Sequence, residues 1–458
     1  MRTSSCFTPS HGQALRAVLA AALVACGGAT FAQSVAPVSA DKDLAARVEA
    51  LARELAELKA QLAAQNAQNA QTAQNAAKAQ AAPAAAGDAG VVNGAPQGIG
   101  PVAEPPATVW SGYGEINFNR YIHDRGNDQA DLRRLVIGMS HRFDARTQLV
   151  TEIEFEHAVT SADDVGEVAI EQAYIERELS PLWSVRAGLF LLPSGLLNEN
   201  HEPTAYYGVE RNLTETAIIP STWREGGVQF LGNLDGGWRV QAGVSTSFDM
   251  SKWDSTDSET ADSPLGAVHQ EMAQAKSRDL AVFGALNWRG VPGLQVGGSL
   301  FRGNAGQQQS NTALNHLSVS LWDLHARYTP GNWDLSTVYA QGTISGTAAF
   351  NLLTLSSGPG WYPVPKRFSG GNVQAAYRLW QYDDYTFKPF VRWERVNTRQ
   401  AYADLGAGLT PEAGEATLVR TAGINIDVGE HVVVKADAQR YQGQTSKNRI
   451  NLGLGWSY

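Results

Sequence analysis

The sequence predicts an all-β protein: a transmembrane antiparallel β-barrel of about 16 strands, with a short coiled-coil helix near the amino terminus. Three observations favour this fold class. The chain ends in an alternating strand whose last residue is aromatic. Segments of about ten residues with a period of two recur from residue 108 onward, as tilted membrane-spanning strands require. Short and long connections alternate between these segments.

The closing segment, residues 449–458, has one apolar and one polar face. Because side chains alternate across a strand, one face carries Ile450, Leu452, Leu454, Trp456 and Tyr458. The other carries Arg449, Asn451, Gly453, Gly455 and Ser457. An apolar face toward lipid and a polar face toward a lumen are typical of a membrane barrel, so this segment is predicted to close one.

Earlier segments repeat the alternation, for example 110–118, 135–143, 149–155, 238–244, 280–288, 333–339, 373–379 and 422–426. Short turns are expected at 144–145, 289–293, 329–332, 383–384 and 429–430. Long polar loops are expected at 249–277, 303–315, 345–367 and 397–414. Aromatic residues beside the short turns predict an interfacial girdle, namely Trp238, Trp288, Tyr328, Trp333 and Tyr385.

Composition excludes several other classes of protein. The longest purely apolar run, residues 17–25, is far shorter than the roughly 18 residues of a spanning helix. The formal net charge of −9 disfavours nucleic acid as a partner, because nucleic acid binds basic surfaces. Both cysteines, Cys6 and Cys26, lie in the amino-terminal region, so no disulfide is expected beyond it.

The amino terminus predicts export from the cytoplasm. Arg2 and Arg16 precede the apolar run 17–25, and Thr30, Phe31 and Ala32 offer a cleavage site, so residues 1–32 are expected to be a signal peptide. Residues 23–26 also resemble a lipobox, in which Cys26 would be acylated. Cleavage after Ala32 is the preferred interpretation.

A short coiled coil and a linker are expected between the signal and the barrel. Within 33–64, an a/d seam is formed by Leu44, Val48, Leu51, Leu55, Leu58 and Leu62. This predicts self-association, although a solitary amphipathic helix on the barrel would show the same pattern. Residues 65–107 are rich in Ala, Gln, Asn and Pro and are expected to be a flexible linker, followed by the barrel at 108–458.

One long connection, residues 193–223, mixes apolar residues, turn formers and charges. Such a mix suits a loop that folds into a lumen, because apolar side chains can attach it to the wall while charged ones face the solute. The candidate constriction residues are Asn198, Glu199, His201, Glu202, Glu210 and Arg211.

Charged residues on the polar face of the predicted strands are candidates for the lumen lining. They are Arg134, Arg142, Glu152, Glu154, Arg186, Arg239, Arg392 and Lys435. The arginines could form a track for anions. Alternatively, they simply face lumen water or pair with Glu152, Glu154 and Glu171.

The stretch NENHEPTAYYGVERNLTETAIIPSTWREGG, residues 198–227, resembles the phosphate-selective porin O/P family of bacterial outer-membrane porins. The order of signal, coiled coil, tether and barrel is also similar, so the resemblance covers residues 41–458. It implies a 16-stranded homotrimer with a constriction in its lumen. Lysine is scarce in the barrel region, which departs from what phosphate selectivity would require.

The expected function is an outer-membrane porin of a Gram-negative bacterium, with the coiled coil in the periplasm. It would let small hydrophilic solutes or ions, including anions such as phosphate, diffuse passively. The alternatives are a barrel-borne enzyme and a structural tether. No enzyme, cofactor or metal is expected: His201 and Glu202 lack the second histidine of H-E-x-x-H, no nucleophile elbow or P-loop occurs, and His141 and His157 have no clear serine partner.

Overall fold

The computed structural model describes residue 53 and residues 107–161, 163–356 and 360–458. The chain divides into two units, residues 1–98 and 99–458, and the second contains the barrel. The predicted signal peptide and the possible acylation site at Cys26 lie outside the described residues. So do the linker 65–106 and, apart from residue 53, the coiled-coil segment 33–64.

The second unit is one antiparallel sheet of 17 strands. Their bounds are β1 Thr108–Tyr121, β2 Gln129–Arg142, β3 Thr147–Glu156, β4 Glu167–Ser180, β5 Trp183–Leu191, β6 Arg224–Leu234, β7 Trp238–Thr246, β8 Leu280–Val291, β9 Leu294–Asn304, β10 Ser318–Tyr328, β11 Trp333–Ser345, β12 Arg367–Tyr377, β13 Trp380–Tyr382, β14 Tyr385–Ala401, β15 Thr417–Val428, β16 Val432–Gln442 and β17 Arg449–Ser457.

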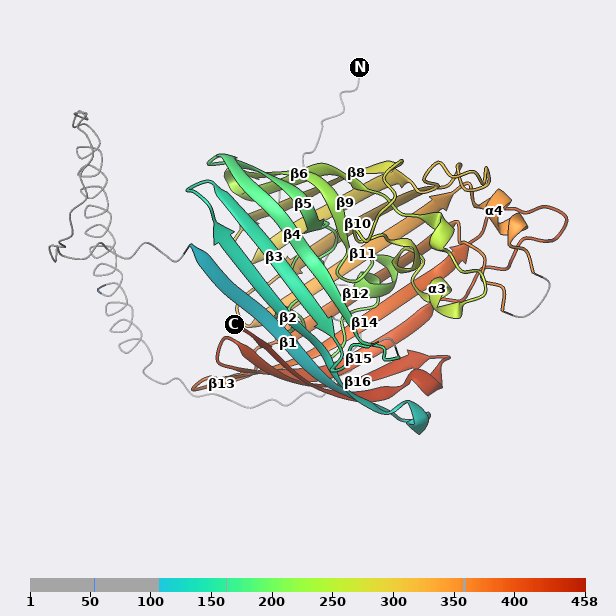
Figure 1. The fold of residues 1–458 in the computed structure, drawn as a ribbon. Helices are drawn as coiled ribbons and strands as arrows, with labels where there is room; N and C mark the ends of the chain where they lie inside the picture. Colours follow the sequence, from blue (N-terminus) through green and yellow to red (C-terminus); the bar gives the residue numbers. More distant parts are fainter. Residues whose placement is uncertain (1–52, 54–106, 162, 357–359) are drawn as a thin grey trace, which may run out of the picture. The chain divides into compact units, whose positions relative to one another are not determined.

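The sheet closes on itself into a 16-stranded barrel (Figure 1). Strands that are neighbours in sequence pair with each other, except β12 and β13, and β1 pairs with both β2 and β17. The three-residue β13 continues β12, because β14 pairs with both along its length. Counting β12 and β13 as one strand confirms the predicted architecture of about 16 strands.

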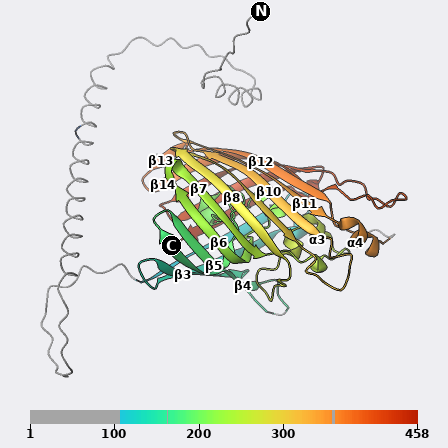
Figure 2. The same cartoon turned by 90° about the horizontal axis from the view of Figure 1, so that it is seen from above.

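Short and long connections lie at opposite ends of the barrel. Figures 1 and 2 show β13, at a short turn, at one end, and the helices α3 (Ser258–Asp262) and α4 (Thr347–Leu353), within long loops, at the other. The alternation of short turns and long loops in the structure therefore agrees with the order predicted from the sequence. Several boundaries were wrong, because strands extend into the predicted connections: residues 289–291 belong to β8, residues 303–304 to β9 and residues 397–401 to β14. The last of these is the largest difference, and Ala401 pairs with Arg367 of β12.

The alternation predicted for the closing strand is confirmed. In β17, Leu452 is 51% exposed on the outer face, whereas its neighbour Asn451 is fully buried on the inner face. The expected aromatics Trp238, Tyr328, Trp333 and Tyr385 are exposed beside the short turns. An outer face of apolar side chains with aromatic residues at its edge suits contact with a lipid bilayer. Among the described residues, no helix is long and apolar enough to cross a membrane.

Candidate functional site

The connection between β5 and β6, residues 192–223, crosses the barrel interior and bonds to several parts of its wall. On the far wall, the backbone N–H of Leu213 donates to Glu394 Oε1 of β14 at 2.6 Å, and that of Val209 donates to Asp437 Oδ2 of β16 at 2.7 Å. Ser194 Oγ donates to Asp323 Oδ2 of β10 at 3.1 Å. We call residues 192–223 the lumen loop.

Apolar side chains attach the base of the lumen loop to one side of the interior. Trp223 is 1% exposed and packs against both Phe248 and Phe301, at ring-centroid distances of 5.4 and 4.8 Å. Ile218 and Ile219 belong to the same buried cluster. Burying these side chains stabilises the loop inside the barrel, because apolar area is removed from the water of the lumen.

Two polar side chains brace the lumen loop internally. Asn198 joins its two ends: its amide donates to the carbonyls of Leu192 and Trp223, both at 2.8 Å, and accepts from Trp223 N at 2.6 Å. Glu215 accepts from the backbone N–H groups of Leu196 and Leu197 at 2.6 and 2.7 Å. Burial raises the pKa of Glu215, and these hydrogen bonds, with one from Asn212, oppose the rise.

Asn198→Ala is expected to lower the free energy of unfolding by about 2–4 kcal/mol, because it leaves buried backbone groups of Leu192 and Trp223 without partners. Denaturant unfolding of the detergent-solubilised protein measures this loss. The matched control is Asn200→Ala, an exposed asparagine of the same loop, which should change stability by no more than about 0.5 kcal/mol. Equal losses for the two variants would contradict the bracing role of Asn198.

A buried group of charges lies on β1 to β3. The Arg134 guanidinium donates to Glu115 at 2.8 Å and to Glu154 at 2.9 Å, and all three side chains are at most 7% exposed. Glu115 also accepts from the Tyr206 hydroxyl of the lumen loop at 2.6 Å. Burial, followed by the charge of Glu115, raises the pKa of Tyr206 well above its usual value. The sequence left open whether Arg134 faces lumen water or pairs with glutamate, and in the structure it pairs with glutamate.

The remaining predicted arginines differ in their surroundings. Arg186 pairs with Glu176 at 2.6 Å. Arg239 lies 3.9 Å from Glu199 Oε1 and stays half-buried. Arg392 pairs with Glu394 at 3.0 Å and donates to the carbonyls of Tyr207 and Glu210, both at 3.1 Å. Arg392 therefore also holds the lumen loop.

Other predicted site residues lie elsewhere. Arg142 was a candidate for the lumen lining, but it is exposed at the short-turn end of β2 because its strand ends there. Lys435 is 2% exposed, with its Nζ 3.5 Å from the centre of the Tyr206 ring.

The predicted constriction residues of the lumen loop have different partners. Glu202 is exposed, and the Glu210 carboxylate accepts a hydrogen bond from Asn119. The Arg211 guanidinium donates to Ser221, to Thr222 and to the carbonyl of His201. Glu152 accepts from Gln172, while His201 faces Glu171.

Between the lumen loop and the wall lies a cavity of about 490 Å³. Its charged lining residues are Glu199, Glu215, Arg186, Arg239, Arg289, Arg327 and Arg392. The sequence did not single out Arg289 and Arg327. Both lie near strand ends beside short turns, where the alternation of inward and outward positions is hardest to assign.

No protein-family model matches the chain. An uncharacterized protein of Aquifex aeolicus (strain VF5) is 28% identical over 387 residues, covering 79% of this chain and 83% of the relative. Among solved structures, OmpF of Salmonella typhi in complex with daunomycin is 13% identical over 77% of this chain and 97% of its own, with a TM-score of 0.52. An anion-selective porin of Comamonas acidovorans is 11% identical over 77% and 99%, with a TM-score of 0.47. The likeness to OmpF shows that this chain has the barrel fold of a porin.

Proposed function

We propose that the protein is an outer-membrane porin: a water-filled channel through which small hydrophilic solutes diffuse, with a preference for small anions. The observation that carries the proposal is the arginine-lined cavity beside a loop that crosses the barrel. A closed barrel with a polar interior and an apolar exterior supplies a path across lipid, and a loop in the lumen narrows it. Lining charge then decides which ions pass.

The preference for anions follows from which charges face the cavity. Five arginines and two glutamates line it. Three of these arginines, Arg186, Arg327 and Arg392, pair with Glu176, Asp334 and Glu394, carboxylates that are not among the lining residues, and Arg186 also lies 3.9 Å from the lining residue Glu199. The positive ends of these pairs therefore lie closer to a passing solute than the negative ends. Phosphate is one anion of suitable size and charge, and the resemblance of the lumen loop to phosphate-selective porins supports testing it.

Orientation and assembly belong to the same proposal. Short turns face the periplasm and long loops face outward in outer-membrane barrels, so the end that carries α3 and α4 is assigned to the cell exterior. The coiled-coil segment would then extend into the periplasm and assist formation of a homotrimer. The heptad pattern within residues 33–64 supports this assignment.

Reconstitution into planar bilayers is expected to give discrete conductance steps and, in a KCl gradient, a reversal potential of the sign for chloride preference. The double variant Arg239→Gln/Arg289→Gln should move the reversal potential toward cation preference, because it removes two positive charges from the cavity lining. Adding phosphate to the chloride solution then tests whether phosphate enters and reduces the chloride current.

The matched control is Arg440→Gln, which removes an exposed arginine from the outward phase of β16. It should leave the reversal potential unchanged. If the wild-type protein gives no conductance steps, the proposal that it forms a channel is rejected. Steps with a cation-type reversal potential would reject only the anion preference.

A further inference from the structure

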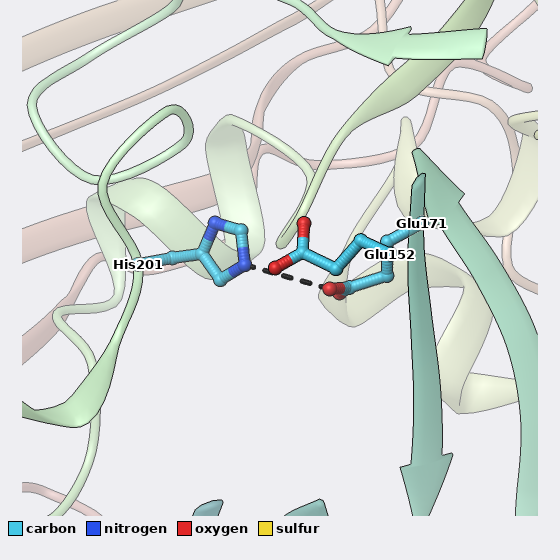
Figure 3. Close-up of side chains that lie close together, drawn as sticks. All are labelled: Glu152, Glu171 and His201. Atoms are coloured by element: carbon cyan, nitrogen blue, oxygen red, sulfur yellow. Dashed lines mark ion pairs between the residues drawn. The ribbon is translucent and has the colours of Figure 1, made fainter. Parts of the chain in front are cut away.

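Three side chains from distant parts of the sequence meet at the barrel wall. Glu152 belongs to β3, Glu171 to β4 and His201 to the lumen loop. Figure 3 shows the imidazole pointing at the two carboxylates. His201 Nε2 lies 3.6 Å from Glu171 Oε2, and one ligand atom from each of the three residues lies within 4.8 Å of the others.

Two of these side chains are almost fully buried and carry unsatisfied polar atoms. His201 is 5% exposed and Glu171 is 0% exposed. Neither His201 Nε2 nor Glu171 Oε1 has a hydrogen-bond partner among the described residues. Buried polar atoms in folded proteins nearly always have a partner, so the unpartnered Nε2, which faces the Glu171 carboxylate, and the unpartnered Oε1 of that same carboxylate indicate a bound species at this cluster.

The hydrogen bond on the other side of the imidazole indicates what that species is. His201 Nδ1 lies 3.0 Å from the carbonyl oxygen of Asn198. A carbonyl only accepts, so Nδ1 carries the hydrogen, and in the neutral ring Nε2 then presents a lone pair. A lone pair that faces a carboxylate is satisfied either by a proton on Nε2 or by a metal cation between the two groups. This arrangement, with the second ring nitrogen donating to a backbone carbonyl, is usual for metal-bound histidines.

The local charge favours a divalent cation. Within the described part of the chain, neither Glu152 nor Glu171 forms an ion pair with lysine or arginine. The neighbouring guanidinium of Arg134 is already shared by Glu115 and Glu154. We propose that Glu152, Glu171 and His201 bind one divalent transition-metal ion of the zinc class. An imidazole with two carboxylates suits zinc better than the all-oxygen preference of magnesium or calcium.

Each proposed ligand already has a neighbour that orients it. The Tyr113 hydroxyl donates to Glu171 Oε2 at 3.3 Å, and the Gln172 amide donates to Glu152 Oε2 at 2.5 Å. Ligand atoms of a tetrahedral zinc site lie about 2.0–2.2 Å from the metal and hence about 3.3 Å apart, so modest side-chain rotation closes the site. Bound metal would tie the lumen loop to β3 and β4, on a part of the wall other than β10, β14 and β16.

The test is metal binding by the full chain in detergent after treatment with EDTA. Titration with Co²⁺ is expected to give visible d–d absorption at one ion per chain, and Zn²⁺ should displace it. His201→Asn and Glu171→Gln should each weaken Zn²⁺ binding by about 100-fold or more, because each removes a proposed ligand and the loss of an outer-shell partner alone costs about 10–100-fold. The matched control is His157→Asn at the end of β3, where His157 pairs with Asp131 and its φ of 59° suits asparagine.

The outcomes separate the proposal from a simple ion pair between protonated His201 and Glu171. Binding by wild type and by His157→Asn, but not by the two ligand variants, supports the site. Equal binding by wild type and the ligand variants overturns it, as does absence of binding by the wild type. Heat-modifiable gel migration shows whether each variant has folded. If a ligand variant fails to fold, Glu152→Gln, at a less buried ligand, takes its place under the same criteria.

Discussion

Deleting residues 449–458, which comprise β17 and Tyr458, is expected to abolish the closed barrel. β17 pairs with β1 on one side and with β16 on the other, so its loss exposes both edges. Each unsatisfied backbone N–H or C=O group in hydrocarbon costs several kcal/mol, far more in total than the net stability of a folded protein. Heat-modifiable gel migration after refolding into detergent micelles or liposomes measures the folded fraction.

Tyr458→Leu is the control for the terminal aromatic. The backbone N–H of Tyr458 donates to the carbonyl of Gly112 at 2.9 Å, and the carbonyl of Tyr458 accepts from the N–H of Gly112 at 3.1 Å. A substitution of the side chain keeps both hydrogen bonds. This variant should therefore refold with wild-type yield in vitro. A truncated chain that still migrates as a compact, heat-modifiable species would show that strand pairing by β17 is not what closes the barrel.

The fold could be predicted from sequence because its strongest constraint is local. A spanning strand needs apolar residues on every second position, and β17 meets this requirement with Ile450, Leu452 and Leu454 outward. The same rule, applied along the chain, gave about 16 strands and the order of turns and loops. The rule fails near strand ends, as at residues 397–401 and at Arg289. There, neither lipid nor a packed interior determines which side chains point outward and which point inward.

The site could be predicted only in part, because its contacts are not local. The composition of residues 193–223 indicated a loop with apolar anchors and charges, and the lumen loop has both. Which wall residues it meets depends on its path through the barrel. The contact of His201 with Glu171 and the bond from Val209 to Asp437 therefore had no signal in the sequence. The partners of Arg134 depend on register, which shifts at a bulge between Glu115 and Ile116.

Arg134→Met is expected to lower the free energy of unfolding by about 3–5 kcal/mol, because it leaves the buried carboxylates of Glu115 and Glu154 without their counter-charge. Denaturant unfolding in a fixed detergent measures the change. Arg239→Met is the matched control: this lumen arginine is 35% exposed and lies 3.9 Å from Glu199, so its loss should change stability by less than about 1 kcal/mol.

The triple variant Arg134→Met/Glu115→Gln/Glu154→Gln separates loss of charge balance from loss of packing. It removes all three charges while keeping the side-chain volumes, and the amide oxygen introduced by Glu115→Gln could still accept from the Tyr206 hydroxyl. Replacing a buried ion pair by neutral groups of similar volume is often close to neutral for stability, so the triple variant should recover most of the loss. If it is as unstable as Arg134→Met alone, the guanidinium stabilises the barrel mainly through its shape and hydrogen bonds. If Arg134→Met and Arg239→Met lose equal stability, burial does not strengthen the contribution of Arg134, and the charges on β1 to β3 act like any other solvated pairs in the lumen.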